Sequence, residues 1–136
     1  MDLLESMAQA AKGMKAQGVR MRIISENLAN AETTSTQKGG NPYQRKVVTF
    51  KDVLDKTSGQ KLVEVDKVVS DKSDFIMKYD PSHPSADKNG YVKMPNVNPL
   101  IEMMDMREAQ RSYEANLGVI DIAKGMISQT LDQLSR

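Results

Sequence analysis

The sequence contains 136 residues, a length that fits one domain. Aromatic residues make up only 4% of the chain and there is no Trp, so we do not expect a large compact core. The formal net charge is +1 and the charges are spread evenly, whereas nucleic-acid-binding proteins gather basic residues on one face. Nucleic acid is therefore not expected as a partner.

Few residues offer catalytic or metal-binding chemistry. The absence of Cys excludes a disulfide, a thiolate nucleophile and a cysteine zinc site. His83 is the single histidine and lies between two prolines, so we expect an exposed loop residue instead of a zinc ligand. Asp87, Asn89 and Gly90 lack the spacing and the closing Glu of a calcium loop, which favours an ordinary turn. We expect no enzyme activity, catalytic residue, cofactor, metal or small-molecule substrate.

The N-terminus carries no sign of a secretory signal. It reads Met-Asp-Leu-Leu-Glu, without the basic residues and the apolar stretch of a cleaved signal peptide. No run approaches the roughly 18 apolar residues of a membrane-spanning helix. If the protein leaves the cytoplasm, we expect a route that does not use such a signal.

Residues 1–30 are predicted to form a helix that ends at Asn30, since Asn tolerates the left-handed backbone common at helix ends. Apolar residues recur at alternating spacings of three and four, the pattern of a helix that packs along one stripe. The positions are Leu3, Met7, Ala10, Met14, Gln17, Met21, Ile24 and Leu28, all of which except Gln17 are apolar. The pliant methionines either fill the contact with one helix or allow packing against several different neighbours.

Residues 31–97 form a central region in which we expect a β-hairpin and loops. Gly and Pro punctuate residues 31–42, and Pro81 and Pro84 exclude regular structure around them. Runs rich in Val and aromatic residues predict strands, and a short helical turn is expected after the first. The predicted strands cover 43–50, 62–69, 75–79 and 91–94, and the helical turn covers 51–55.

Residues 98–136 are predicted to form a second long helix. Asn98 is a suitable N-cap, and Pro99 fits the first helical position because an N–H there has no helical partner. Glu102 is expected among the solvated or interface charges of this helix. The apolar stripe runs through Met103, Met106, Tyr113, Leu117, Ile120, Ile127, Leu131 and Leu134, and it is interrupted at Gln110 and Lys124.

A second apolar stripe with the same spacing lies on another face of this helix. It consists of Ala115, Val119, Ile122 and Met126. A helix that packs against one neighbour needs only one apolar stripe, so the second predicts contact with another subunit. Gly118 and Gly125 lie seven residues apart, and either they are tolerated locally or they let a neighbouring helix come close.

The predicted fold is mainly α with a small β region. The N-terminal helix (1–30) and the C-terminal helix (98–136) are expected to pair as a coiled coil, with the central hairpin and loop segment (31–97) between them. The expected intramolecular contact uses Met7, Met14, Met21, Ile24 and Leu28 of the first helix and Tyr113, Leu117, Ile120, Ile127 and Leu131 of the second.

Two stretches resemble the axial proteins of the bacterial flagellar rod and hook. Ser25–Thr34 with residues 42–46 resembles the asparagine-rich signature at the end of their N-terminal helix. Residues 79–98, followed by Glu102-Met103 and residues 111–116, are similar to the proximal rod proteins of the basal body. The matching positions include Asn27, Asn30, Tyr43, Asn89, Gly90, Tyr91, Pro95, Asn96 and Asn98.

The resemblance implies a structural subunit that polymerises by helix packing into the proximal rod, the drive shaft that transmits torque. It implies type III export without a cleaved signal peptide, and assembly in the periplasm as part of the basal body. The implied partners are proximal rod neighbours, the distal rod, the basal adaptor at the export gate and copies of the same chain, with transient contact to the export apparatus. A soluble coiled-coil adaptor or export chaperone is the alternative that the two-helix pattern alone permits.

Overall fold

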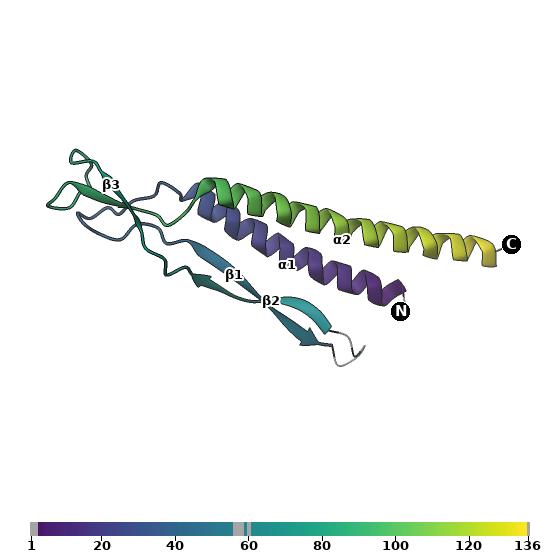
Figure 1. Ribbon diagram of the computed structural model, residues 1–136. Helices are drawn as coiled ribbons and strands as arrows, with labels where there is room; N and C mark the ends of the chain where they lie inside the picture. The colour runs from purple at the N-terminus through teal and green to yellow at the C-terminus, as the bar shows by residue number, and fades with distance from the viewer. Residues whose placement is uncertain (1–2, 56–58, 60, 136) are drawn as a thin grey trace. The chain divides into compact units, whose positions relative to one another are not determined.

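The computed structural model describes residues 3–55, 59 and 61–135 (Figure 1). These residues form two helices and two small antiparallel sheets, so the predicted class, mainly α with a small β region, is confirmed. The elements are α1 (Leu3–Ala29), β1 (Lys46–Leu54), β2 (Lys61–Ser70), β3 (Ile76–Tyr79), β4 (Tyr91–Met94) and α2 (Pro99–Leu134). The sheets pair β1 with β2 and β3 with β4.

Asn98 caps the N-terminus of α2, as the sequence predicts. Its side-chain Oδ1 accepts a hydrogen bond from the Leu100 N–H at 3.1 Å. Its backbone oxygen accepts one from the Glu102 N–H at 3.0 Å. Pro99 is the first helical residue, where the helix requires no N–H. The start of α2 is therefore set by two neighbouring residues.

α1 ends close to the predicted position but in a different way. No described residue other than Gly has a positive φ, so the prediction of a left-handed Asn30 is wrong. The Asn30 side-chain amide instead donates to the Glu26 backbone oxygen at 2.9 Å, and its Oδ1 accepts from the Thr33 hydroxyl at 3.1 Å. The Asn30 side chain thus bonds back to the last turn of the helix and forward to the loop that follows it.

β1 continues through residues 51–54, where the sequence predicted a helical turn. Its pairing with β2 is marked by two hydrogen bonds. The Asp71 N–H donates to the Arg45 oxygen at 2.8 Å, and the Thr49 hydroxyl donates to the Lys67 oxygen at 3.2 Å. Pairing with a second strand overrides the weak local preference of these residues, so the predicted helical turn is wrong.

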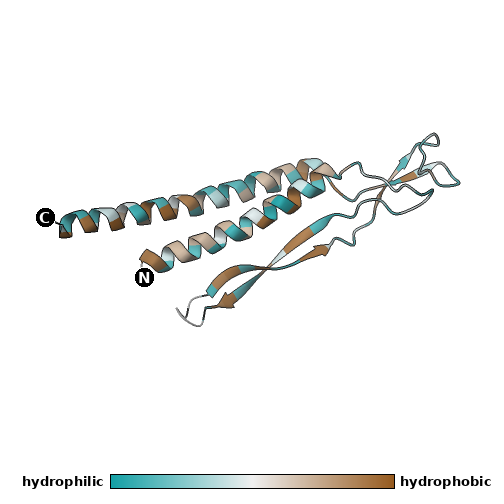
Figure 2. Ribbon diagram, turned by 180° about the vertical axis from the view of Figure 1, so that it is seen from behind, coloured by the Kyte–Doolittle hydropathy of each residue, from teal (hydrophilic) through white to brown (hydrophobic). Residues whose placement is uncertain are grey.

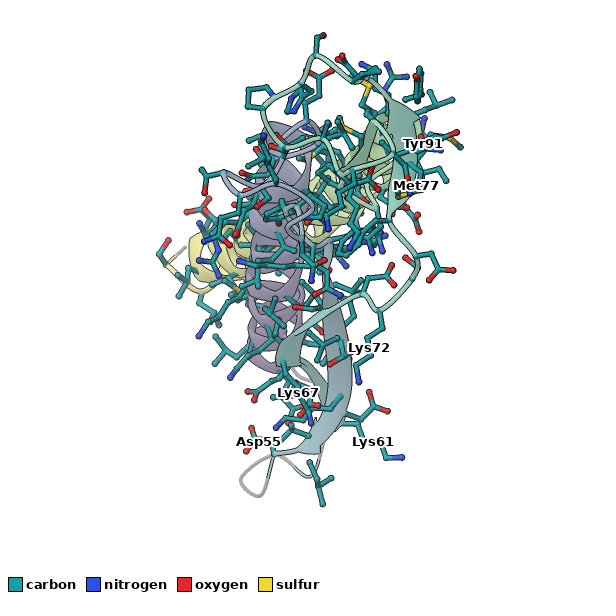
Figure 3. The ribbon with its side chains drawn as sticks, turned by 90° about the vertical axis from the view of Figure 1, so that its left-hand side faces the viewer. Asp55, Lys61, Lys67, Lys72, Met77 and Tyr91 are labelled. Atoms are coloured by element: carbon teal, nitrogen blue, oxygen red, sulfur yellow. The ribbon has the colours of Figure 1, made fainter. Side chains whose placement is uncertain are left out.

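β3 and β4 pair from Ile76 opposite Met94 to Tyr79 opposite Tyr91. The rings of Tyr79 and Tyr91 meet edge to face, with centroids 5.2 Å apart. Met77 and Tyr91, both labelled in Figure 3, remain about half exposed on this sheet. The aromatic pair therefore stabilises a sheet that buries few side chains.

The chain forms two compact units, each of which takes parts of both helices and of the first sheet. Unit 1 comprises Met1–Met21, Thr49–Lys67 and Arg107–Arg136, and unit 2 comprises Arg22–Val48 and Val68–Met106. Residues far apart in the sequence therefore meet within each unit.

In unit 1, α1 and α2 lie side by side in opposite directions (Figure 1). The guanidinium of Arg20 lies 3.6 Å from the Glu108 carboxylate, and a Cβ added to Gly13 would lie 2.7 Å from the Asn116 Nδ2. The buried apolar residues on the two helices of this unit are Ala10, Ala16, Ala109 and Ala123. Small side chains thus allow the two helices to approach closely.

An ion pair joins the first sheet to α1 within unit 1. Lys12 Nζ lies 2.6 Å from Glu64 Oε1, and this hydrogen bond with its opposite charge raises the pKa of Lys12 and lowers the pKa of Glu64. Both side chains are well exposed, so the pair adds little to stability. Leu62 on β2 is buried.

We expect Gly18→Ala to raise the free energy of unfolding by up to about 1 kcal/mol, because Ala favours a helix and the added Cβ meets nothing within 4 Å.

Gly13→Val should lower the free energy of unfolding by about 1–3 kcal/mol, because the side chain would overlap Asn116. Urea unfolding followed by circular dichroism measures both. Gly18→Val is the matched control, and equal stability of the two valine variants would contradict close helix packing at Gly13.

Candidate functional site

A network of buried polar side chains lies in unit 2 around Asn27, which is 1% exposed. Its amide donates to the Lys46 backbone oxygen at 2.8 Å and to Glu102 Oε2 at 3.2 Å. Its Oδ1 accepts from the Tyr43 hydroxyl at 2.8 Å and from the Lys46 N–H at 2.9 Å. Burial raises the pKa of Tyr43, which keeps this hydroxyl a donor. The buried amide therefore uses both donors and both acceptor positions.

Glu102 and Arg45 form the charged part of the network. Glu102 is 1% exposed, so of the two expected settings, a solvated charge or an interface charge, the solvated one is wrong. Its Oε1 accepts a hydrogen bond from Arg45 Nε at 2.5 Å. Burial lowers the pKa of Arg45, but hydrogen bonds and charges from Glu102 and Asp71 outweigh burial and raise it. The charged guanidinium compensates a carboxylate that would be costly to bury alone.

Asn96 links the start of β1 to the loop that follows β2. Its Oδ1 accepts from the Arg45 N–H at 2.8 Å, and its Nδ2 donates to the Asp71 and Ser73 backbone oxygens at 3.1 and 3.2 Å. The Ser73 N–H, with a contribution from Arg45, lowers the pKa of Asp71. Asn96 therefore binds two segments that are distant in the sequence.

Asn89, Gly90 and Tyr91 form the expected turn before β4. The Asp87 Oδ1 accepts hydrogen bonds from the N–H groups of Asn89 at 2.8 Å and Tyr91 at 2.9 Å. Gly90 has a φ of 81°, and a Cβ there would lie 3.0 Å from the Pro81 ring. Both the backbone conformation and the lack of space require Gly at this position.

His83 lies in the loop before this turn. It is half-buried, less exposed than the sequence suggested, and its Nδ1 accepts a hydrogen bond from the Ser85 N–H at 3.1 Å. The Ser85 hydroxyl in turn donates to the Ser35 backbone oxygen. His83 thus helps to order a loop. The family-motif positions from Asn27 to Asn98, including the buried Pro95, lie in unit 2, whereas residues 111–116 of the resemblance lie in unit 1.

Within residues 3–55, 59 and 61–135, no group of three or more His, Asp or Glu side chains is arranged to hold a metal ion. In the same part of the chain, neither helix is long and apolar enough to cross a membrane. In unit 2 these hydrogen bonds form a rigid junction between the end of α1, the start of β1, two loops and the start of α2.

Comparison with known proteins gives the same family over the whole chain. The model for the C-terminal region of flagellar basal-body rod FlgEFG proteins matches residues 88–134. The flagellar basal-body rod protein FlgC of Agrobacterium fabrum is 51% identical over 135 residues, which cover 98% of this chain and 97% of that protein. FlgC of Borreliella burgdorferi is 42% identical over 149 residues, and FlgC of Salmonella typhimurium is 39% identical over 133 residues. Each of these two alignments covers 96% of this chain and 97% of the relative. The chain belongs to the FlgC family.

Membership of the FlgC family confirms the predicted resemblance. The chain is a structural component of the flagellar basal-body rod and not an enzyme. The alternative of a soluble adaptor or export chaperone is not favoured, because the relatives are rod proteins. A flagellar location follows from the same relatives.

The contact residues predicted from the heptads lie at different depths. Ile24 is buried, Met7, Met14, Met21, Leu28, Tyr113, Ile120 and Ile127 are half-buried, and Leu117 and Leu131 are exposed. On α2, the side chain that meets Gly13 is Asn116, one residue before Leu117. One residue turns a helix by about 100°, so Gly13 meets the face of α2 that carries Asn116. Close approach favours the smaller residues of that face.

Ala115, Val119, Ile122 and Met126, called the outer stripe below, are exposed on α2. The exposed fractions of Val119, Ile122 and Met126 are 43%, 67% and 50%. Burial within the subunit therefore does not account for these apolar residues.

A further apolar surface at the start of α2 was predicted only at Met103, which belongs to the predicted apolar stripe. It consists of Leu100, Ile101, Met103 and Met104, which surround the buried Glu102 in sequence and are more than half exposed. Arg45 and Glu102 were also missed as partners. A signal existed, since Glu102, Ala109, Asn116 and Ala123 recur every seven residues and mark the inner face of α2.

We expect Asn27→Ala to lower the free energy of unfolding by about 3 kcal/mol or more, since it leaves buried groups of Tyr43, Lys46 and Glu102 without partners. Asn89→Ala is the control in the same family motif, because Asn89 is exposed and should change stability by less than about 0.5 kcal/mol. Urea unfolding measures both changes: the midpoint should shift while the slope of the free energy of unfolding against urea concentration stays constant. Similar midpoints for the two variants would show that the network contributes little.

Proposed function

We propose that this FlgC-family chain is a subunit of the proximal rod, and that it polymerises by helix packing into the drive shaft that transmits torque. The observation that carries the proposal is the exposed outer stripe of α2 in a chain that matches rod proteins over its full length. A helix with two apolar faces is suited to one partner inside the subunit and one outside.

In this proposal α1 and α2 pair as a coiled coil inside the subunit. Their antiparallel contact in unit 1 supports it, because Gly13, Asn116, Arg20 and Glu108 already lie in register. The half-buried residues Met7, Met14, Tyr113 and Ile120 would complete that contact.

The outer stripe would then pack against the helices of neighbouring subunits. Burying a large aliphatic side chain contributes about 1.5–3 kcal/mol, and Val119, Ile122 and Met126 are each exposed enough to gain from burial. A repeated head-to-tail contact of this kind generates a helical polymer.

The proposed partners are copies of the chain and the neighbouring rod proteins: other proximal rod proteins, the distal rod and the basal adaptor at the export gate. We place assembly in the periplasm, after export through the flagellar type III apparatus without a cleaved signal peptide. The family supports this route, since its members are flagellar basal-body rod proteins.

We expect Val119→Asp and Ile122→Asp to give folded but unassembled subunits and non-motile cells. Each would place an unpaired carboxylate in an apolar contact between subunits, which costs several kcal/mol. Ile122 is 67% exposed, so the thermal unfolding of the purified monomer should hardly change. Swimming assays and electron microscopy of basal bodies measure the outcome.

Asp121→Ala is the control for this experiment, because Asp121 is exposed beside the outer stripe and carries a charge instead of apolar surface. It should assemble nearly normally. Complete rods in Ile122→Asp cells would mean that this face stays in solvent and that α2 has no second partner.

A further inference from the structure

Two polar loops of unit 2 meet at Ser85. Residues 31–42 belong to the segment between α1 and β1, and residues 80–90 connect β3 to β4. Ser85 is 5% exposed. Its hydroxyl donates to the Ser35 backbone oxygen, and its own backbone oxygen accepts from the Gly39 N–H at 3.1 Å. Figure 2 shows few hydrophobic residues in these two loops, so hydrogen bonds carry much of the contact between them.

A further hydrogen bond of Ser85 depends on His83. The Ser85 N–H donates to His83 Nδ1 at 3.1 Å. A ring nitrogen accepts only while it carries a lone pair, so the neutral imidazole has its proton on Nε2. A second proton goes to Nδ1 and places two N–H groups face to face. Protonation of His83 therefore abolishes this bond and leaves the N–H of the buried Ser85 without its acceptor.

Charged side chains of both signs line the two hollows next to His83. They are Glu32 and Lys38 from the first loop, Lys78 from β3, and Asp80, Asp87 and Lys88 from the second loop. Hydrogen bonds from Ser82, with a contribution from the charge of His83, hold the pKa of Asp80 below its ordinary value. Asp80 therefore still carries its negative charge between pH 5 and 8, the range in which histidines take up a proton, and it attracts a charged imidazole ring.

We propose that His83 is a pH-sensitive latch between the two loops. The neutral ring holds the Ser85 N–H, and Ser85 in turn binds residues 31–42 through Ser35 and Gly39. When the ring takes up a proton from solvent, it turns from Ser85 toward the carboxylate of Asp80, and residues 31–42 are released. Because the bond favours the neutral ring, it stabilises the contact between the loops in neutral solution, and this stabilisation is lost as the pH falls. The latch does not depend on rod assembly.

Nuclear magnetic resonance of the purified full chain tests the latch. Nitrogen chemical shifts of the ring identify the protonated nitrogen, which should be Nε2 in neutral solution. On titration from about pH 8 to about pH 5, the ring of His83 and the amides of Ser85 and Gly39 should change with one common midpoint. Below this midpoint, the protection of the two amides against hydrogen exchange, corrected for the intrinsic effect of pH, should fall about three- to tenfold, as expected for the loss of one hydrogen bond.

Three substitutions separate a latch from a histidine that only fills space. His83→Asn places a side-chain oxygen near the position of Nδ1 but does not titrate, so the Gly39 amide should stay protected throughout the titration. His83→Leu has no acceptor, so this protection should be low at every pH. Asp80→Asn keeps an oxygen that accepts from Ser82 but loses the charge, so the midpoint of His83 should move to lower pH.

The Lys46 amide is the internal control, because it donates to Asn27 Oδ1 in the same unit and should keep its protection. Equal protection of the Gly39 amide at both ends of the titration in the parent chain would overturn the latch. A neutral His83 ring with its proton on Nδ1 would overturn it as well. The same result follows if the Gly39 amide behaves alike in the His83→Asn and His83→Leu chains.

Discussion

The carboxylate of Glu102 is buried in unit 2 and must have both a counter-charge and hydrogen-bond donors there. Arg45 at the start of β1 supplies the charge, and Asn27 near the end of α1 supplies the second donor. Asn96 then fixes the backbone of Arg45 against the loop after β2. One charged group thus dictates where four segments of the chain meet, in a protein with too few aromatic residues to do this by apolar packing.

Local signals predicted the elements well where one or two neighbouring residues decide the outcome. Asn98 and Pro99 set the start of α2 through contacts within a single turn. Residues 51–54 were misread because pairing with β2, the next strand of the chain, holds them extended beyond the predicted end of the first strand. Leu117 was assigned to the helix contact from its place in the heptad, and the residue that meets Gly13 is its neighbour Asn116. Hydrophobic periodicity locates a helix more securely than the face that it turns inward.

The candidate site was foreseen in part. The asparagine-rich motif pointed to Asn27, Tyr43 and Asn96, but a motif does not say which side chains are buried together. Glu102 was expected to be a solvated or an interface charge, since acids are rarely buried unless they are paired. Its burial became understandable only with Arg45, 57 residues earlier in the chain, beside it.

The exposed apolar residues have a common physical meaning. Two groups of apolar side chains are exposed to water: Leu100, Ile101, Met103 and Met104 in unit 2, and the outer stripe in unit 1. The core of this chain is too small to bury them. Large exposed apolar patches on soluble proteins commonly mark interaction sites. The methionines among them add the pliancy that suits contacts with non-identical neighbours.

The junction at Asn27 also has a mechanical consequence. Apolar side chains that pack against each other can slide or roll at small cost, because dispersion forces have no preferred direction. Hydrogen bonds weaken steeply when donor and acceptor turn away from each other. Since Asn27 of α1 bonds directly to Glu102 of α2, and both are tied to β1, turning either helix about its own axis breaks several bonds at once. For a subunit proposed to carry torque, this junction supplies torsional stiffness that a helix pair of the same size held only by apolar contacts would lack.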